Sequence, residues 1–131
     1  LRIQAEALRE LHQLDEALEK IEQSLENCTD QRLPYAQGCC WRTLGKIQRD
    51  RGFEWADRSG VAFEKALKLF DEHGARHALA VTRREFASFL LEVDEPDLAS
   101  DQLELALATF SELDCPEETR MTMAIRDSIA R

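Results

Sequence analysis

The chain has 131 residues, a length that suits a single domain. Charged residues make up 33% of it and apolar residues 44%, and the formal net charge is −9, from 17 basic and 26 acidic residues. This acidity argues against binding to nucleic acid or to anionic membranes, because both require a positive surface. The apolar runs are also shorter than the roughly 18 residues of a membrane span. Because the first residue is Leu1 and not Met, we expect a piece of a larger protein.

Four cysteines are present, at positions 28, 39, 40 and 115. Neighbouring Cys39 and Cys40 cannot easily pair with each other, and no Cys-x-x-Cys spacing occurs. We therefore expect reduced, mostly buried thiols in a cytoplasmic protein, with no metal site.

Apolar residues recur with a helical period along the chain, as at Leu14, Leu18, Ile21 and Leu25. No segment alternates with a period of two, which predicts an all-α protein without strands. The predicted helices span about 1–12, 14–28, 34–51, 54–73, 76–93, 96–113 and 116–130. The predicted core contains Leu14, Leu18, Ile21, Leu25, Trp41, Leu44, Phe63, Leu67, Phe86, Leu90, Leu103, Leu107 and Phe110.

Prolines and glycines mark the ends of these helices. Pro34, Pro96 and Pro116 suit the first turn of a helix, where a missing N–H does no harm. Gly52 and Gly74 follow basic residues, and they predict helix ends with a left-handed glycine.

A pattern of apolar and small residues recurs at intervals of 42 and 40 residues. Its members are Ile21-Ser24-Leu25, Phe63-Ala66-Leu67 and Leu103-Ala106-Leu107. Small residues also recur at Ala5, Gly45 and Ala87, with the intervals 40 and 42. A period between 20 and 50 residues is typical of a solenoid. We therefore predict one repeat domain, with repeats at about 1–33, 34–75 and 76–115 and a capping helix over 116–131.

The segment Trp41-x-x-Leu44-Gly45 resembles the opening of a tetratricopeptide repeat. The segment 12–18, His-Gln-Leu-Asp-Glu-Ala-Leu, resembles the start of that repeat's second helix. The resemblance implies a right-handed α-α superhelix of three helix-turn-helix repeats plus the capping helix. These repeats are longer than the usual 34 residues and are similar to those of bacterial signalling and regulatory proteins. Two departures are Gln48, where an apolar residue is usual, and Arg83, where Trp41 stands one repeat earlier.

No catalytic constellation stands out. His73 and His77 are four residues apart, but Gly74 between them predicts a helix end that separates the pair. No phosphate-binding loop and no glycine-rich dinucleotide motif occurs. We therefore expect no enzymatic activity and no cofactor.

In tetratricopeptide arrays the first helices of the repeats line a concave groove that holds a partner, and the resemblance carries this groove over to the present chain. Six of the nine inward positions are then basic in an acidic protein. The candidate partner-binding residues are Arg2, Arg9, Arg42, Lys46, Arg49 and Arg84. Such a groove favours an acidic segment of a protein or peptide. The alternative is a solvated face with pairs within each helix, such as Glu6 with Arg9.

We expect a non-catalytic protein-interaction module, the sensing or scaffolding part of a larger cytoplasmic bacterial regulator. An alternative is an oligomerisation or structural element without an external ligand. It would associate through Ile3 and Leu8 at one end and Met121, Met123 and Ile125 at the other. A third reading is an effector-sensing domain, which would need a deep apolar pocket between the first helices.

Overall fold

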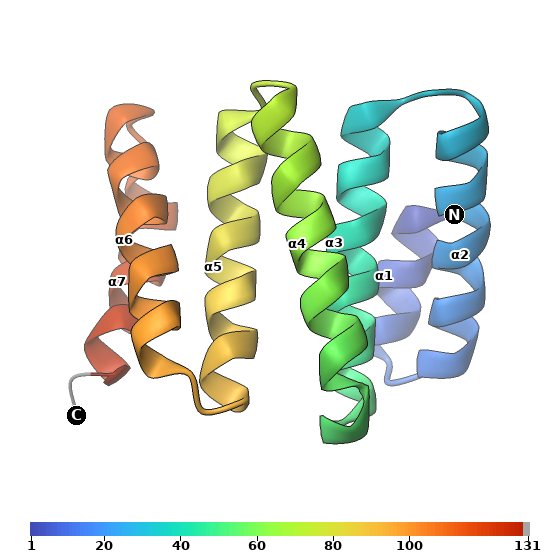
Figure 1. Cartoon of the computed structure of the whole chain (residues 1–131), viewed down its shortest axis with the longest axis horizontal. Coiled ribbons are helices and arrows are strands. Elements are labelled where there is room, and N and C mark those ends of the chain that lie inside the picture. The colour runs from blue at the N-terminus through green and yellow to red at the C-terminus, as the bar shows by residue number, and fades with distance from the viewer. Residues whose placement is uncertain (130–131) are drawn as a thin grey trace. The chain divides into compact units, whose positions relative to one another are not determined.

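The computed structural model of the chain describes residues 1–129. These residues form seven α-helices and no strand, as the hydrophobic period predicts. The helices are α1 (Arg2–Glu10), α2 (Leu14–Asp30), α3 (Pro34–Arg51), α4 (Ala56–Glu72), α5 (Arg76–Glu92), α6 (Pro96–Glu112) and α7 (Pro116–Ile129) (Figure 1). A short 3-10 helix, Phe53–Trp55, precedes α4, so this helix begins two residues later than predicted. Ala130 and Arg131, the end of the predicted capping helix, lie outside the described residues.

The turns after α1, α2, α5 and α6 share one backbone geometry. Each contains a non-glycine residue with φ between 55° and 61°, namely His12, Arg32, Asp94 and Asp114. The N–H of the residue that follows each of these donates to a carbonyl five residues back, over 2.8 to 3.0 Å. These bonds satisfy carbonyls at the helix ends, as in a Schellman motif. Gly52 (φ 120°) and Gly74 (φ 67°) end α3 and α4, which confirms the predicted glycine stops.

Contacts group the helices into two compact units, Leu1–Gly74 with α1 to α4 and Ala75–Arg131 with α5 to α7. Within each unit every helix packs against its neighbour in sequence. In the view of Figure 1, α4 of the first unit lies in front of α3, and α2 lies beside α3. In the second unit, α6 lies in front of α7.

In the core of the first unit, the helices pack closely at small residues. Ala5, Ala17, Ile21, Cys40 and Ile47 form one buried cluster that spans α1, α2 and α3. Between α3 and α4, two buried glycines lie against phenylalanine rings. A Cβ at Gly45 would lie 3.0 Å from the Phe63 ring, and one at Gly38 would lie 2.6 Å from Phe70. The small residue predicted to recur at Gly45 therefore lies where α3 and α4 approach closely.

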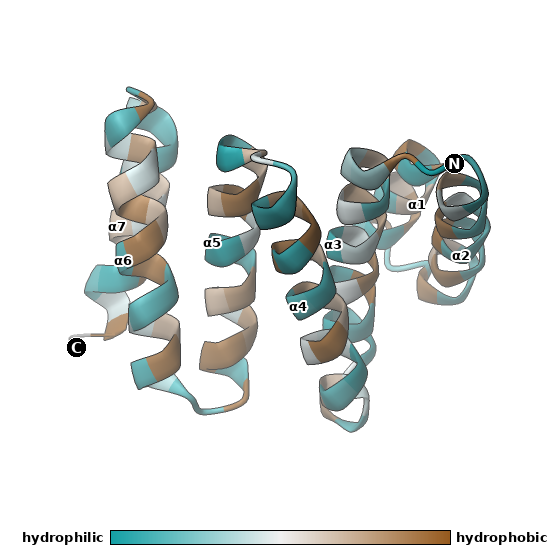
Figure 2. Cartoon of the chain, turned by 45° about the horizontal axis from the view of Figure 1, so that its top comes forward, coloured by the Kyte–Doolittle hydropathy of each residue, from teal (hydrophilic) through white to brown (hydrophobic). Residues whose placement is uncertain are grey.

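The second unit repeats this arrangement with alanines in place of glycines. Ala80 of α5 packs with Ala106 and Phe110 of α6 in one buried cluster. Hydrophobic residues colour the facing sides of α5 and α6, whereas α2 is hydrophilic over most of its visible length (Figure 2).

The predicted core is buried at six residues and partly buried at the other seven, of which Leu18, Leu25 and Leu44 pack against the buried cluster of the first unit. Ile21, Phe63, Phe86, Leu90, Leu103 and Phe110 are buried. Leu14, Leu18, Leu25, Trp41, Leu44, Leu67 and Leu107 are only half-buried. The helices approach most closely at alanine and glycine, so the flanking large side chains lie at the edge of each contact instead of its centre. No helix within residues 1–129 is both long and apolar enough to cross a membrane.

Candidate functional site

Charged side chains of α1 and α3 meet on one face of the first unit, which we call the basic face. It consists of Arg2, Glu6 and Arg9 of α1 and Arg42, Lys46, Arg49 and Asp50 of α3. In each helix the first three of these residues are spaced by four and three positions, so they share one side. All seven are half-buried. The face thus brings together five of the six predicted binding residues.

Glu6 lies at the centre of the basic face and joins the two helices. Lys46 Nζ donates to Glu6 Oε1 over 3.2 Å, and the Thr43 hydroxyl donates to the same oxygen over 2.9 Å. Arg9 Nε donates to Glu6 Oε2 over 3.2 Å. Burial by itself would raise the pKa of Glu6, but Lys46, Thr43 and Arg9 together outweigh it, so the pKa of this carboxyl is lowered.

Asp50 provides a second link between α1 and α3. Arg9 Nη1 donates to Asp50 Oδ2 over 3.0 Å, and Arg49 Nε donates to Asp50 Oδ1 over 3.4 Å. Burial opposes the charge of Arg9, but Asp50 and Glu6 outweigh burial and raise the pKa of its guanidinium.

Arg2 and Arg42 differ from the other cations of the basic face. They stand 40 residues apart at equivalent places in α1 and α3, one turn before Glu6 and Lys46. In the part of the chain that the structure describes, neither has a carboxylate as an ion-pair partner. The Arg42 guanidinium lies 5.8 Å from the centre of the Phe70 ring.

Arg84, the sixth predicted binding residue, belongs to the second unit and is only 7% exposed. It forms an ion pair with Glu118 of α7 and lies 5.8 Å from the centre of the Phe110 ring. Because its guanidinium is already used to join α5 to α7, we leave Arg84 out of the basic face.

Within residues 1–129 no three His, Cys, Asp or Glu side chains are placed to hold a metal ion. His73 ends α4 and His77 lies in α5, so the predicted separation of this pair is confirmed. What the face offers is a fixed set of N–H donors suited to carboxylates.

Sequence reasoning placed Glu6 on this face but missed Asp50. The sequence contains a signal for Asp50 as an ion-pair partner, because this residue follows Arg49 directly and lies four residues after Lys46. Such spacing predicts pairs within α3. It does not predict that Arg9, 41 residues away, is the partner with the shorter bond to Asp50.

Comparisons with protein-family models, with curated proteins and with solved structures found no match to this chain.

Proposed function

We propose that the chain is a non-catalytic protein-interaction module that binds an acidic segment of a partner protein on the basic face. The observation that carries the proposal is the charge of this face. Five basic and two acidic side chains give it a net charge of +3 in a chain whose net charge is −9. A positive face on an acidic body selects acidic partners and disfavours others.

The basic face is also held in place before any partner arrives. The side chains of Glu6, Arg9, Lys46, Arg49 and Asp50 are only 14–23% exposed, and each takes part in an ion pair. A partner therefore meets ordered donors and loses less conformational entropy on binding. Arg2 and Arg42 border this network and supply charge that no carboxylate of the described residues neutralises.

The proposal includes a tetratricopeptide-like array as the scaffold, within a larger cytoplasmic bacterial regulator. Equivalent positions of the predicted repeats have equivalent burial, which supports this reading. Fully buried small residues recur at Ala5, Gly45 and Ala87 in the first helices and at Ala17, Ser59 and Ala99 in the second helices. Ser59 replaces the alanine, and its hydroxyl donates to the Gly45 carbonyl over 2.7 Å.

The test is binding of a glutamate-rich, fluorescently labelled probe peptide, followed by anisotropy. We expect the double variant Arg2→Gln, Arg42→Gln to bind about tenfold more weakly than the unaltered protein, because two desolvated charge pairs are lost. Removing these two charges leaves the hydrogen bonds of Glu6 and Asp50 intact. Reversing the charge of Lys46 or Arg49 would break some of these hydrogen bonds.

The matched control is Lys20→Gln, Arg120→Gln, which removes the same charge from α2 and α7. If the control weakens binding as much as the test variant does, the attraction is a property of the whole chain and the basic face is not the site. Absence of binding by the unaltered protein would also reject the proposal.

Self-association is a second candidate that the exposed apolar side chains favour. Ile3 is 76% exposed, Met121 47% and Met123 39%, whereas Leu8 and Ile125 are half-buried. Met123 also lines a hollow between α6 and α7 beside Phe110. Light scattering over a range of concentrations tests this candidate. A rise in mass that Met121→Asp, Met123→Asp abolishes supports it, and a constant monomer mass rejects it.

A further inference from the structure

A second surface of the first unit has the features of a docking site and is independent of the basic face. Trp41, Leu44 and Gln48 of α3 lie on a different side of that helix from Arg42, Lys46 and Arg49. Together with Val61 and Ala62 of α4 they line a hollow of about 330 Å³. We call the hollow and its continuation along α4 the outer groove.

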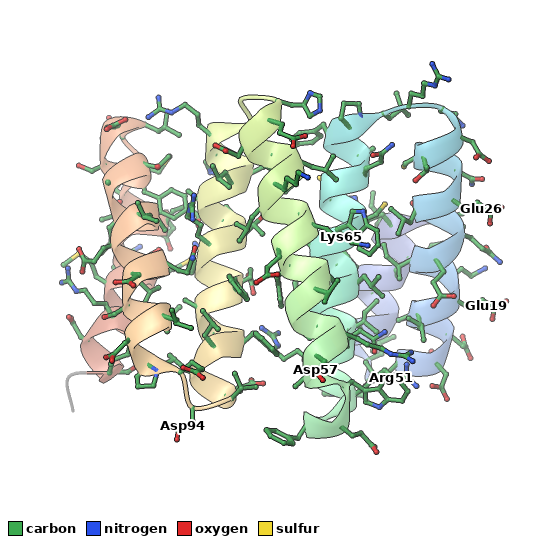
Figure 3. The ribbon with its side chains drawn as sticks, in the orientation of Figure 1. Glu19, Glu26, Arg51, Asp57, Lys65 and Asp94 are labelled. Atoms are coloured by element: carbon green, nitrogen blue, oxygen red, sulfur yellow. The ribbon has the colours of Figure 1, made fainter. Side chains whose placement is uncertain are left out.

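Trp41 stands at the middle of the outer groove. On its other side a second hollow of about 300 Å³ is lined by Gln37, Lys65, Lys68 and Leu69. The ammonium group of Lys65 lies 4.3 Å from the centre of the Trp41 ring, over its face. Figure 3 shows Lys65 reaching from α4 across α3. A half-exposed tryptophan flanked by two hollows is the kind of anchor that dominates protein interfaces.

The equivalent positions of the other second helices show that Val61 is exceptional. Val61 is 50% exposed, yet Glu19 of α2 and Asp101 of α6 stand at the corresponding places. Both are exposed and charged, as a solvated position requires. An apolar residue is not needed at this position, so the exposed surface of Val61 is available to a partner.

The charges along α4 indicate what the groove accepts. Arg58 and Lys68 of α4 replace Glu16 and Glu26 of α2, and Lys65 replaces Gln23. In Figure 3, Glu19 and Glu26 lie on the side of α2 that faces away from α4. The groove thus has an apolar floor and a basic rim, in contrast to the acidic outer side of α2.

Arg58 lies at one end of this rim against the Trp55 ring, and Arg51, which is outside the lining of the hollows, lies against the same tryptophan ring. The guanidinium groups of Arg51 and Arg58 lie 3.7 and 4.9 Å from the centre of the Trp55 ring. Trp55 belongs to the 3-10 helix before α4, which is an insertion relative to the other repeats. Asp57 and Glu72 are the acidic residues that also line the groove.

We propose that the outer groove binds a segment of a partner protein that carries one aromatic or aliphatic side chain flanked by carboxylates. The apolar side chain enters the hollow beside Trp41 and Val61, and the carboxylates meet Arg58, Lys65 and Lys68. This site goes beyond the proposed function, because it uses another side of α3 and a different anchor.

The experiment uses Trp41 as the reporter in a Trp55→Phe background, which leaves one tryptophan in the chain. The probe is a short acetylated and amidated peptide with one phenylalanine among glutamates. We expect a saturable change in Trp41 fluorescence, about tenfold weaker binding for Val61→Glu, and similar weakening when the probe's phenylalanine is replaced by serine.

Val61→Glu introduces the residue that α2 has at Glu19, so we expect the fold to be retained, which circular dichroism checks. Lys65→Glu, at an exposed position, is a second variant that should weaken binding. The proposal is overturned if the unaltered groove shows no saturable signal, or if neither groove variant weakens binding. It is also overturned if Arg2→Gln, Arg42→Gln abolishes the signal, because the probe would then occupy the basic face.

Discussion

Glu6 shows how a single carboxylate connects segments that are distant in sequence. It accepts hydrogen bonds from Arg9 on its own helix and from Thr43 and Lys46, which lie 37 and 40 residues away. Because the side chain is mostly buried, losing these partners leaves a desolvated group without compensation. The role of this residue is therefore structural as well as electrostatic.

Acidification should weaken the fold through Glu6. Its pKa in the folded chain is lowered from the ordinary value of 4.5, so its stabilising contribution is present above this pH and is lost as the pH falls below it. Urea unfolding above and below pH 4.5 measures the effect. Glu6→Gln should lower the free energy of unfolding at neutral pH by about 1–2 kcal/mol and reduce its pH dependence. An unchanged pH dependence in this variant would contradict the assignment.

Gly38 should not tolerate a methyl group. A Cβ there would lie 2.6 Å from the ring of Phe70, which is 1% exposed and packs against the Tyr35 ring at 5.6 Å. Gly38→Ala gains about 1 kcal/mol in helix propensity, but overpacking costs about 1–3 kcal/mol. We expect a net loss of about 1 kcal/mol in the free energy of unfolding, measured by urea titration. Adding Phe70→Leu should cost less in this background than in the unaltered chain, and simple additivity would argue against a clash.

At the scale of elements, turns of the same kind end successive helices at regular intervals. His12 and Arg32 lie 20 residues apart, as do Asp94 and Asp114, and all four have positive φ. Non-glycine side chains are strained in this region, and Asp is tolerated better than most. The equivalent position after α4 is Gly74. Local geometry is thus shared between turns whose residue types differ.

Replacing Asp94 by glycine should stabilise the protein. Glycine adopts positive φ without a steric cost, and this gain exceeds the entropy that it adds to the unfolded chain. We expect Asp94→Gly to raise the free energy of unfolding by about 0.5 kcal/mol in thermal denaturation. The control Asp101→Gly, inside α6, should lower it by about 0.3 kcal/mol, the difference in helix propensity between Asp and Gly. A loss of stability in Asp94→Gly would show that the aspartate side chain itself supports the turn.

At the scale of the whole molecule, the division into two units has a consequence for folding. The cluster of Ala5, Ala17, Ile21, Cys40 and Ile47 lies entirely within Leu1–Gly74. Helical arrays gain stability from interactions between neighbours, so a unit with its own core needs little from more distant parts. We expect a fragment of residues 1–74 to show a helical circular dichroism spectrum and a cooperative thermal transition. A fragment that is unfolded under native conditions would contradict this expectation.

The pattern of apolar residues, prolines and glycines predicts all seven helices within residues 1–129 and most of their ends. These features depend on local interactions, which proline, glycine and the apolar period report directly. The sequence also indicates small residues at Ala5, Gly45 and Ala87, because these positions recur at intervals of 40 and 42 residues. In contrast, the sequence does not reveal which charges of the candidate site are already paired. Asp50 bonds to Arg9 and Arg84 to Glu118 across helices, and the outer groove forms where Trp41 meets Val61. Such pairings depend on the rotation and spacing of packed helices, which a one-dimensional pattern does not contain.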